Sequence, residues 1–153
     1  MKIRIEVDEN LIEDEVVIKC KSLSEDIHKI QSAIADIATK TQRFVFYKGD
    51  TEYYLSLEEV LFFETEENGI CVHTVDNVYQ TKYRLYELEE LLPGYFMRVS
   101  KSSILNINQI YSISRNLSAA SIVQFQNTHK QVYVSRYYYK PLKERLEEKR
   151  MSK

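Results

Sequence analysis

The stretch FMRVSKSSILNINQI, residues 96–110, has two halves with different chemistry. The first half holds cations and hydroxyls: Arg98, Ser100, Lys101, Ser102 and Ser103. Point charges beside short hydrogen-bond donors suit the oxygens of a phosphodiester backbone. The second half holds apolar residues at three- and four-residue steps: Ile104, Leu105, Ile107 and Ile110. This spacing indicates one face of a helical turn, so we expect a polar patch beside a buried anchor, although a capped helix start has a similar composition.

The length of 153 residues allows one sizeable core with a small appendage, but not two full domains. Hydrophobic residues at 44% and charged residues at 29% are ordinary for a globular protein and argue against disorder. No apolar run reaches the roughly eighteen residues that span a bilayer, and residues 1–6 alternate instead of forming a signal-peptide core. We interpret the chain as cytoplasmic.

The net charge of −2 conceals a strong asymmetry along the chain. Residues 98–153 hold eleven Lys or Arg and three Asp or Glu, a charge of +8, whereas residues 1–97 carry −10. Such a split is expected when one part of a protein meets nucleic acid and another meets solvent or a partner. A basic C-terminal helix that complements its own dipole would account for only part of the positive charge.

Residues 1–40 predict a small β-β-α extension. Alternation over residues 3–7 and a β-branched run at 16–18 indicate two strands around an acidic turn at 8–10. Ser22 and Glu25 have capping-box spacing ahead of a helix with an apolar stripe: Leu23, Ile27, Ile30, Ile34 and Ile37. This helix could pack on its own sheet or form a dimer seam. The polar residues 39–42 mark the boundary to a second domain at 41–150.

Residues 41–150 predict a mainly β domain, α+β overall once its short flanking helices are included. Aromatic and β-branched runs indicate strands at residues 43–48, 51–57, 60–65, 70–75 and 78–81, with the strongest turn signal at Asn68-Gly69. A leucine-rich helix at 85–92 ends at Pro93. Three further strands are expected at 111–114, 122–126 and 131–135, and Pro141 places the start of a regular terminal helix near Lys140.

No constellation of catalytic residues stands out. The three histidines are scattered, and no zinc-protease motif, CxxC pair or glycine-rich phosphate loop occurs. Glu64, Glu66 and Glu67 could form a metal or acid-base group, but a solvated turn is the favoured interpretation. Cys20 and Cys71 stand in apolar contexts, so we expect two buried thiols and neither a disulfide nor a metal pair. We therefore expect no enzymatic activity, no cofactor and no small-molecule substrate.

Two stretches resemble the LytTR family of bacterial DNA-binding transcription regulators. FMRVSKSSILNINQI at residues 96–110 and VYVSRYYYKPLKERL at residues 132–146 follow that family's pattern of F-x-R, a cation before serine, a later asparagine, and V-S-R. The resemblance covers about residues 43–149. It implies an elongated all-β DNA-binding fold of short strands. Residues 1–40 lie outside the family core and are too short for a receiver domain, which needs roughly 100 residues or more.

The resemblance also implies which side chains meet DNA. Family members insert loops from one edge of the β structure into successive major grooves, and their base-contacting positions correspond to Asn68, Lys101 and Arg136. Arginine reads guanine, asparagine pairs with adenine, and lysine replaces the family's more frequent arginine at position 101. Six further residues would hold backbone phosphates: Arg98, Ser100, Ser102, Ser103, Lys130 and Lys140.

Two residues of the central stretch keep a structural interpretation. Arg98 could equally be a salt-bridge partner, and Asn106 resembles a cap. We expect a sequence-specific double-stranded DNA-binding transcription regulator that acts as a homodimer on repeated sites. The alternative is a protein-interaction or ligand-sensing module whose split charge serves a partner protein. The resemblance further implies restraint by a membrane-bound inhibitor protein, for which acidic residues between 8 and 15 offer a surface, although a solubilising surface is the simpler interpretation.

Overall fold

The computed structural model describes residues 1–12, 14–41 and 44–151. The helices are α1 (Glu25–Thr41), α2 (Leu85–Leu91) and α3 (Arg136–Met151), with short 3-10 turns η1 (Leu57–Glu59) and η2 (Ile107–Gln109). The strands are β1 (Phe44–Lys48), β2 (Thr51–Leu55), β3 (Phe62–Glu66), β4 (Gly69–His73), β5 (Val78–Thr81), β6 (Phe96–Arg98), β7 (Ser103–Asn106), β8 (Ile110–Ser114), β9 (Ser121–Phe125) and β10 (Gln131–Val134). The predicted mainly β class is confirmed.

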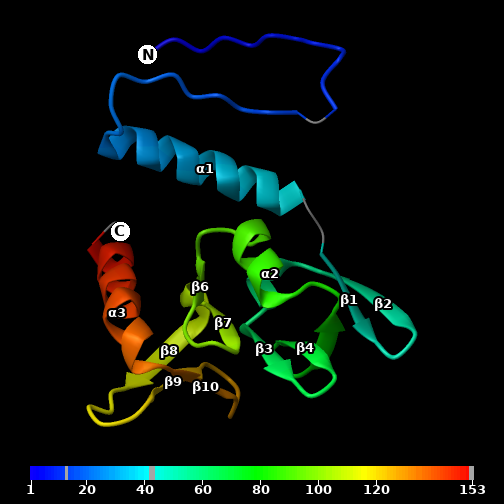
Figure 1. Cartoon of the computed structure of the whole chain (residues 1–153), viewed down its shortest axis with the longest axis vertical. Coiled ribbons are helices and arrows are strands. Elements are labelled where there is room, and N and C mark those ends of the chain that lie inside the picture. The colour runs from blue at the N-terminus through cyan, green and yellow to red at the C-terminus, as the bar shows by residue number, and fades with distance from the viewer. Residues whose placement is uncertain (13, 42–43, 152–153) are drawn as a thin grey trace.

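The strands form two sheets (Figure 1). The larger sheet has the strand order β2-β1-β5-β4-β3-β7-β6, the smaller has the order β10-β9-β8, and neighbouring strands pair antiparallel. β3 lies inside the larger sheet, where Phe63 pairs with Val72 of β4 on one side and Ile104 of β7 on the other. This pairing brings residues 96–110 beside the β3–β4 hairpin.

Adjacent residues of β3 enter two separate cores, because successive side chains of a strand point to opposite faces. Phe63 packs with the buried leucines of α2, whereas Phe62 packs with β9, β10 and Leu142 of α3. Ile104 and Leu105 of β7 divide in the same way. Each such fully buried side chain contributes roughly 1.5–3 kcal/mol to stability. The centre of the larger sheet is therefore covered on both faces.

Residues 103–106 form strand β7, so the predicted helical turn over the second half of the central stretch is wrong. All four residues are buried, because β7 lies between β3 and β6 and carries core side chains on both faces. A strand buried on both faces has a continuous apolar run that also fits helical spacing. The turn that forms is η2, and Asn106 Oδ1 caps it by accepting a hydrogen bond from Asn108 N at 2.9 Å, as predicted.

The N-terminal extension contains its predicted helix. α1 begins at Glu25, and Ser24 Oγ accepts a hydrogen bond from Ile27 N at 3.4 Å, so the cap lies two residues beyond Ser22. Residues 1–12 and 14–24 run extended around a turn at residues 8–10 but contain no hydrogen-bonded strand (Figure 1). The two expected strands thus do not pair, because an isolated two-stranded hairpin without a covered apolar face is marginal in water.

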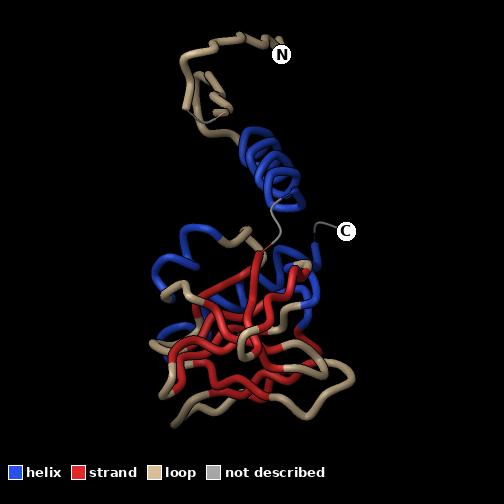
Figure 2. The backbone as a smooth tube through the Cα atoms, turned by 90° about the vertical axis from the view of Figure 1, so that its right-hand side faces the viewer, coloured by secondary structure: helices blue, strands red, loops and turns tan. Residues whose placement is uncertain are grey.

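Many apolar side chains of the extension are exposed, although Ile27, Ile30 and Ile34 of α1 are half-buried. Figure 2 shows α1 and the preceding residues beyond the sheets. Ile3 is 90% exposed and Ile37 of α1 is 65% exposed. Cys20 is exposed, contrary to the expected buried thiol, whereas Cys71 is buried and both thiols are free. α1 runs through residues 39–41, part of the polar segment predicted to follow it. Residues 13, 42 and 43 lie outside the described part of the chain.

The terminal helix α3 begins at Arg136 rather than near Lys140. Tyr138 N donates to Ser135 O at 3.0 Å, so the helix opens directly after β10. Pro141 lies inside it and removes one hydrogen bond to the carbonyl of residue 137. Pro141 and Tyr137 are both exposed, so water can satisfy that carbonyl. Leu142, fully buried, anchors the helix to the second core.

Candidate nucleic-acid interface

The loop between β6 and β7, residues 99–102, is held by one guanidinium group. Arg98 Nε donates to Ser100 O at 2.6 Å, and Nη2 donates to Lys101 O. Nη1 makes an ion pair with Glu89 of α2. The Arg98 side chain is 22% exposed, with its nitrogens committed to these partners. Arg98 therefore shapes the loop, which supports the structural alternative for this residue over a phosphate contact.

Lys101 lies exposed in this loop, on a backbone that Arg98 fixes. Ser100 and Ser102 are half-buried beside it, with Ser102 N donating to Ser100 Oγ at 3.2 Å. Ser103 is different, because it is only 2% exposed and its hydroxyl hydrogen-bonds to the Glu64 carboxylate. Lys101, Ser100 and Ser102 are placed to meet a ligand from solvent, whereas Ser103 has an internal role.

The junction between β10 and α3 is joined to the same loop. Ser135 N donates to Val99 O at 2.9 Å, immediately before Arg136 opens α3. Arg136 is exposed, and so is Lys140 one turn later along the helix. Residues four apart lie on the same helix face, so both cations point to the same side of α3. A cation at a helix start gains nothing from the helix dipole, so the dipole does not account for an arginine at position 136.

The β3–β4 turn, residues 67–68, carries the exposed Asn68. Gly69, which follows, has a φ of 122°, a conformation that glycine adopts at no steric cost. Thr65 N, two residues before the turn, donates to Ser102 O at 2.8 Å. This bond ties the hairpin to the β6–β7 loop. The exposed Glu66 and Glu67 place negative charge beside Asn68.

Lys130 does not join this surface as a free cation. Its Nζ donates to Thr74 O and to Asn77 O, each at 2.8 Å, and burial lowers the pKa of its ammonium group. Lys130 therefore clamps the β4–β5 turn. Of the residues predicted to hold phosphates, Ser100, Ser102 and Lys140 remain available, and three are committed inside the protein: Arg98, Ser103 and Lys130.

Two backbone hydrogen bonds thus join three loops that the sequence places far apart. Thr65 to Ser102 links the first pair, and Ser135 to Val99 links the second. Asn68, Lys101 and Arg136 each project from one of these loops. Sequence patterns missed Glu89 as the partner that orients Arg98. Its only local signal is an acidic residue on a helix face, which reads as solvated.

A comparison with known families identifies the family of this chain. A family model described as the LytTr DNA-binding domain matches residues 50–147. The chain belongs to this family. The LytTr match includes all three joined loops and the core residues other than Phe44 and Phe46 of β1, and it leaves the N-terminal extension outside.

Relatives and a solved structure agree with this assignment. An uncharacterised HTH-type transcriptional regulator of Staphylococcus aureus strain NCTC 8325 is 28% identical over 146 residues, covering 95% of this chain and 98% of the relative. A regulator of the same description from S. aureus strain MW2 is 27% identical over 146 residues. The LytTr DNA-binding domain of a Bacillus cereus protein superposes with a TM-score of 0.62 at 24% identity, over 68% of this chain and 95% of that domain. This likeness confirms the fold.

Among the residues that the structure describes, none of the helices combines the length and apolar character needed to cross a membrane. A helix-turn-helix reader needs two successive helices joined by a turn of about 3–4 residues. Here strands separate α1 from α2 and α2 from α3.

Proposed function

We propose that this chain is a sequence-specific, double-stranded DNA-binding transcription regulator that reads bases through three loops. The loops are the β3–β4 turn, the β6–β7 loop and the β10–α3 junction. One observation carries the proposal: Asn68, Lys101 and Arg136 are exposed on three loops that two backbone hydrogen bonds join. These bonds run from Thr65 N to Ser102 O and from Ser135 N to Val99 O. A rigid base under exposed readers is what specific recognition needs, because each reader then has one position relative to the others.

Each proposed contact follows from side-chain chemistry. Arg136 can make a bidentate contact to guanine, Lys101 can donate to guanine less rigidly, and Asn68 can pair with adenine. Lys140, Ser100 and Ser102 would contact backbone phosphates, which fix register without carrying sequence information. The structure gives Arg98 and Lys130 enough internal partners that they enter the proposal as residues that shape loops.

Loops rather than a recognition helix are proposed as the readers. Strands lie between successive helices of the described chain, and the exposed cations Lys101 and Arg136 lie on linked loops. Loops on the edge of a β structure can enter a major groove, which is about 12 Å wide. The name of the staphylococcal relatives, HTH-type, describes a different DNA-reading element, the helix-turn-helix.

A homodimer on repeated sites is part of the proposal. One LytTr domain would cover a site of about one DNA turn, and two tethered copies gain affinity by effective concentration. The exposed isoleucines of residues 1–12, with the exposed Ile37 and the half-buried Ile27, Ile30 and Ile34 of α1, supply an apolar surface for a second copy. Restraint by a membrane-bound inhibitor protein is proposed as the control, with the exposed Asp8 and Glu9 as an acidic surface for it. Unchanged promoter control after removing these charges would argue against that surface.

DNA titration tests the central proposal. A duplex selected from a random library is labelled and titrated with the full chain at several salt concentrations, beside a scrambled duplex of equal length. We expect log affinity to fall linearly with log salt, because bound cations release counterions from phosphates, and the selected duplex to bind more tightly at every salt concentration. Weak binding with a flat salt response, or no sequence preference, would contradict the proposal.

A further inference from the structure

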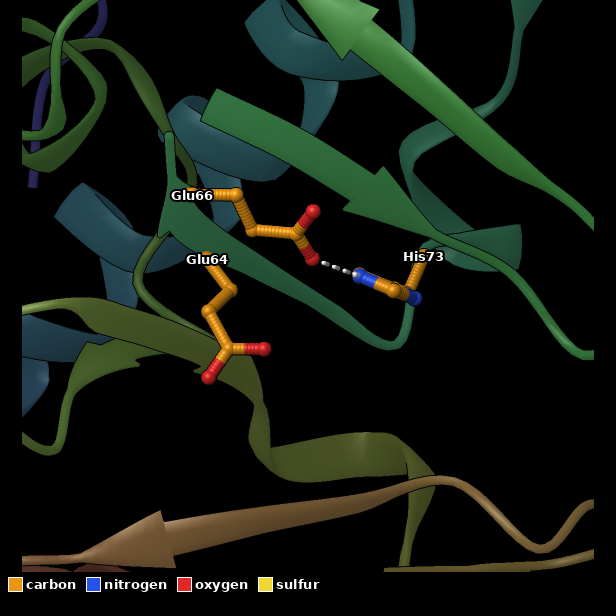
Figure 3. A group of neighbouring side chains, drawn as sticks. All are labelled: Glu64, Glu66 and His73. Carbon is orange, nitrogen blue, oxygen red and sulfur yellow. Dashed lines mark ion pairs between the residues drawn. The ribbon is translucent and has the colours of Figure 1, made fainter. Parts of the chain in front are cut away.

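A group of potential metal ligands lies at the base of the β3–β4 hairpin. Glu64 and Glu66 of β3 and His73 of β4 bring one ligand atom each within 4.8 Å of one another. Figure 3 shows the Glu66 carboxylate directed at the His73 ring, with the Glu64 carboxylate beside them. His73 Nε2 lies 3.6 Å from Glu66 Oε1, just beyond hydrogen-bonding distance. Within the described ranges of the chain, this is the one group of its kind.

His73 is held in place but its nitrogens lack partners. Its ring stacks on Phe62 at a centroid distance of 4.3 Å, and Phe62 in turn stacks on Phe125 of β9. Both ring nitrogens are shielded from solvent and make no hydrogen bond to any described residue. Buried polar atoms almost always find a partner, so two orphaned nitrogens on a fixed ring indicate a ligand that completes the site.

The charges of the site also favour a cation. Burial first, and then the neighbouring Glu66 carboxylate, raise the pKa of Glu64, while the Ser103 hydroxyl opposes this rise. Burial first, and then the Lys130 ammonium group, lower the pKa of His73 against the opposing effect of Glu66. Metal ions bind the neutral imidazole, which is the form that a lowered pKa favours. A cation between the carboxylates would offset their mutual repulsion.

We propose that Glu64, Glu66 and His73 bind a divalent first-row transition metal ion of the zinc type, and that this ion strengthens DNA binding through the adjoining β3–β4 turn. An imidazole with two carboxylates suits such an ion better than Mg²⁺ or Ca²⁺, which prefer oxygen ligands alone. Bonds of about 2.0–2.2 Å in a tetrahedral zinc site place ligand atoms about 3.4 Å apart. The Glu66 and His73 atoms, 3.6 Å apart, are already near that spacing. The Glu64 oxygen, within 4.8 Å of the other two ligand atoms, reaches it by a small side-chain rotation.

Two neighbours shape the site further. Lys130 lies close enough to depress the pKa of His73, and its positive charge opposes a dication. Its ammonium group is turned toward Thr74 O and Asn77 O, which moderates that opposition. Cys71 pairs with Glu64 across the strands, and burial, with help from Glu66 and then Glu64, raises the pKa of its thiol to about 11. Cys71 is not assigned as a ligand, because its sulfur is not among the ligand atoms that lie within 4.8 Å of one another.

The link to DNA follows from position, and this part rests on the proposed function. Glu66 is the last residue of β3, next to the turn that carries Asn68. A metal ion that joins Glu66 to His73 would neutralise charge beside the phosphates and fix the base of that turn. Both effects would raise DNA affinity. Neutralisation reduces the repulsion from the phosphates, and a turn that is already fixed loses less conformational entropy on binding.

The test begins with metal binding in the absence of DNA. The tag-free full chain in its reduced form is titrated with Zn²⁺ by calorimetry and with Co²⁺ by visible absorption. The variants are Glu66→Gln, whose side chain is 52% exposed so that the fold tolerates the change, and His73→Gln, with circular dichroism confirming the fold. The matched control is Glu67→Gln, which removes the same charge one residue away from the ligand group. A Cys20→Ser variant controls for binding at the exposed thiol.

We expect one Zn²⁺ per chain, an affinity at least about tenfold weaker for Glu66→Gln, and little change for Glu67→Gln. Absence of binding by the native chain at millimolar Zn²⁺, or binding that Cys20→Ser abolishes and Glu66→Gln leaves intact, would overturn the site. DNA titration with and without Zn²⁺ should then show tighter binding for the native chain and Glu67→Gln, and no zinc response for Glu66→Gln. Metal binding without a DNA response overturns the coupling alone, and a chain that binds metal but no DNA contradicts the proposed function alone.

Discussion

The backbone N–H of Ser135 donates to the carbonyl of Val99 at 2.9 Å, across two segments that are remote in the sequence. This bond fixes the start of α3 against the β6–β7 loop, so Arg136 and Lys101 are presented from one rigid base. Thr65 N to Ser102 O extends the same base to the β3–β4 hairpin. Because side chains at a specific site must hold their relative positions to within a fraction of an ångström, these bonds matter as much as the readers.

Arg136 and Lys140 provide a matched pair on α3 for separating base readout from phosphate contact. Arg136→Ala should weaken binding to the selected duplex by about 1–3 kcal/mol and relax preference at one base position. Lys140→Ala should weaken selected and scrambled duplexes alike and lower the slope of log affinity against log salt by about one. Fluorescence anisotropy on both duplexes measures these effects. Equal losses on both duplexes for Arg136→Ala would identify that residue as a phosphate contact.

Arg98 is predicted to act through geometry rather than charge. Arg98→Lys keeps the cation but cannot bridge Glu89 and the carbonyls of Ser100 and Lys101 together, because an ammonium group lacks the guanidinium fork. Arg98→Lys and Arg98→Ala should therefore both lower DNA affinity and protection of the loop amides in hydrogen exchange. If Arg98→Lys restored native affinity while Arg98→Ala did not, a direct phosphate contact would be the better account.

Local sequence patterns predicted the strands and turns whose conformation depends mainly on neighbouring residues. The strands β8, β9 and β10 were recognisable from their β-branched runs, and the Asn68-Gly69 pair marked the β3–β4 turn, where Gly69 adopts a positive φ at no steric cost. β7 was misjudged as helical because burial on both faces erases the alternation that identifies a strand. The apolar neighbours of Cys20 also predicted a buried thiol, but the described residues of the extension form no sheet that could bury it.

The candidate site depended on contacts between remote segments. Asn68, Lys101 and Arg136 came from a family pattern, and nothing in their own neighbourhoods indicates that hydrogen bonds join their loops. The cluster of Glu64, Glu66 and His73 could not be predicted from local sequence either, since Glu66 and His73 meet only through the register of β3 and β4. Long-range pairing therefore decides which predicted residues are free to bind and which are committed to the fold.

Acidification should destabilise the domain through His73. Burial lowers the pKa of His73 below the 6.5 of an ordinary histidine, so between that folded pKa and about 6.5 the unfolded chain binds the proton more readily. The free energy of unfolding should therefore fall as the pH drops below 6.5. Urea unfolding of the native chain and of His73→Gln at several pH values checks this. The difference in unfolding free energy between the native chain and His73→Gln should shrink or reverse on acidification. A difference that stays constant would contradict a lowered pKa for His73.

The two thiols should react at very different rates. Burial raises the pKa of Cys71 to about 11, so the thiolate is scarce near neutral pH, whereas Cys20 is exposed. Iodoacetamide at neutral pH should modify Cys20 in the folded chain and reach Cys71 only after denaturation. Mass spectrometry of proteolytic peptides measures both sites. Comparable rates at the two cysteines in the folded chain would show that the β3–β4 hairpin opens readily.

Residues 1–40 are predicted to hold the dimer together. Both cores lie within residues 44–146, so a fragment of residues 44–153 retains the packing of the domain. The extension contributes the isoleucine stripe of α1, of which Ile37 is 65% exposed, and a second copy would cover it. Light scattering at micromolar concentration should find a dimer for the full chain and a monomer for the fragment.

Within the full chain, Ile37→Glu should weaken the dimer, because it places a charge in the covered stripe. Ser32→Glu, on the opposite face of α1, is the matched control and should leave the dimer intact. A fragment that remains dimeric, or a full chain that is monomeric, would contradict this role for the extension.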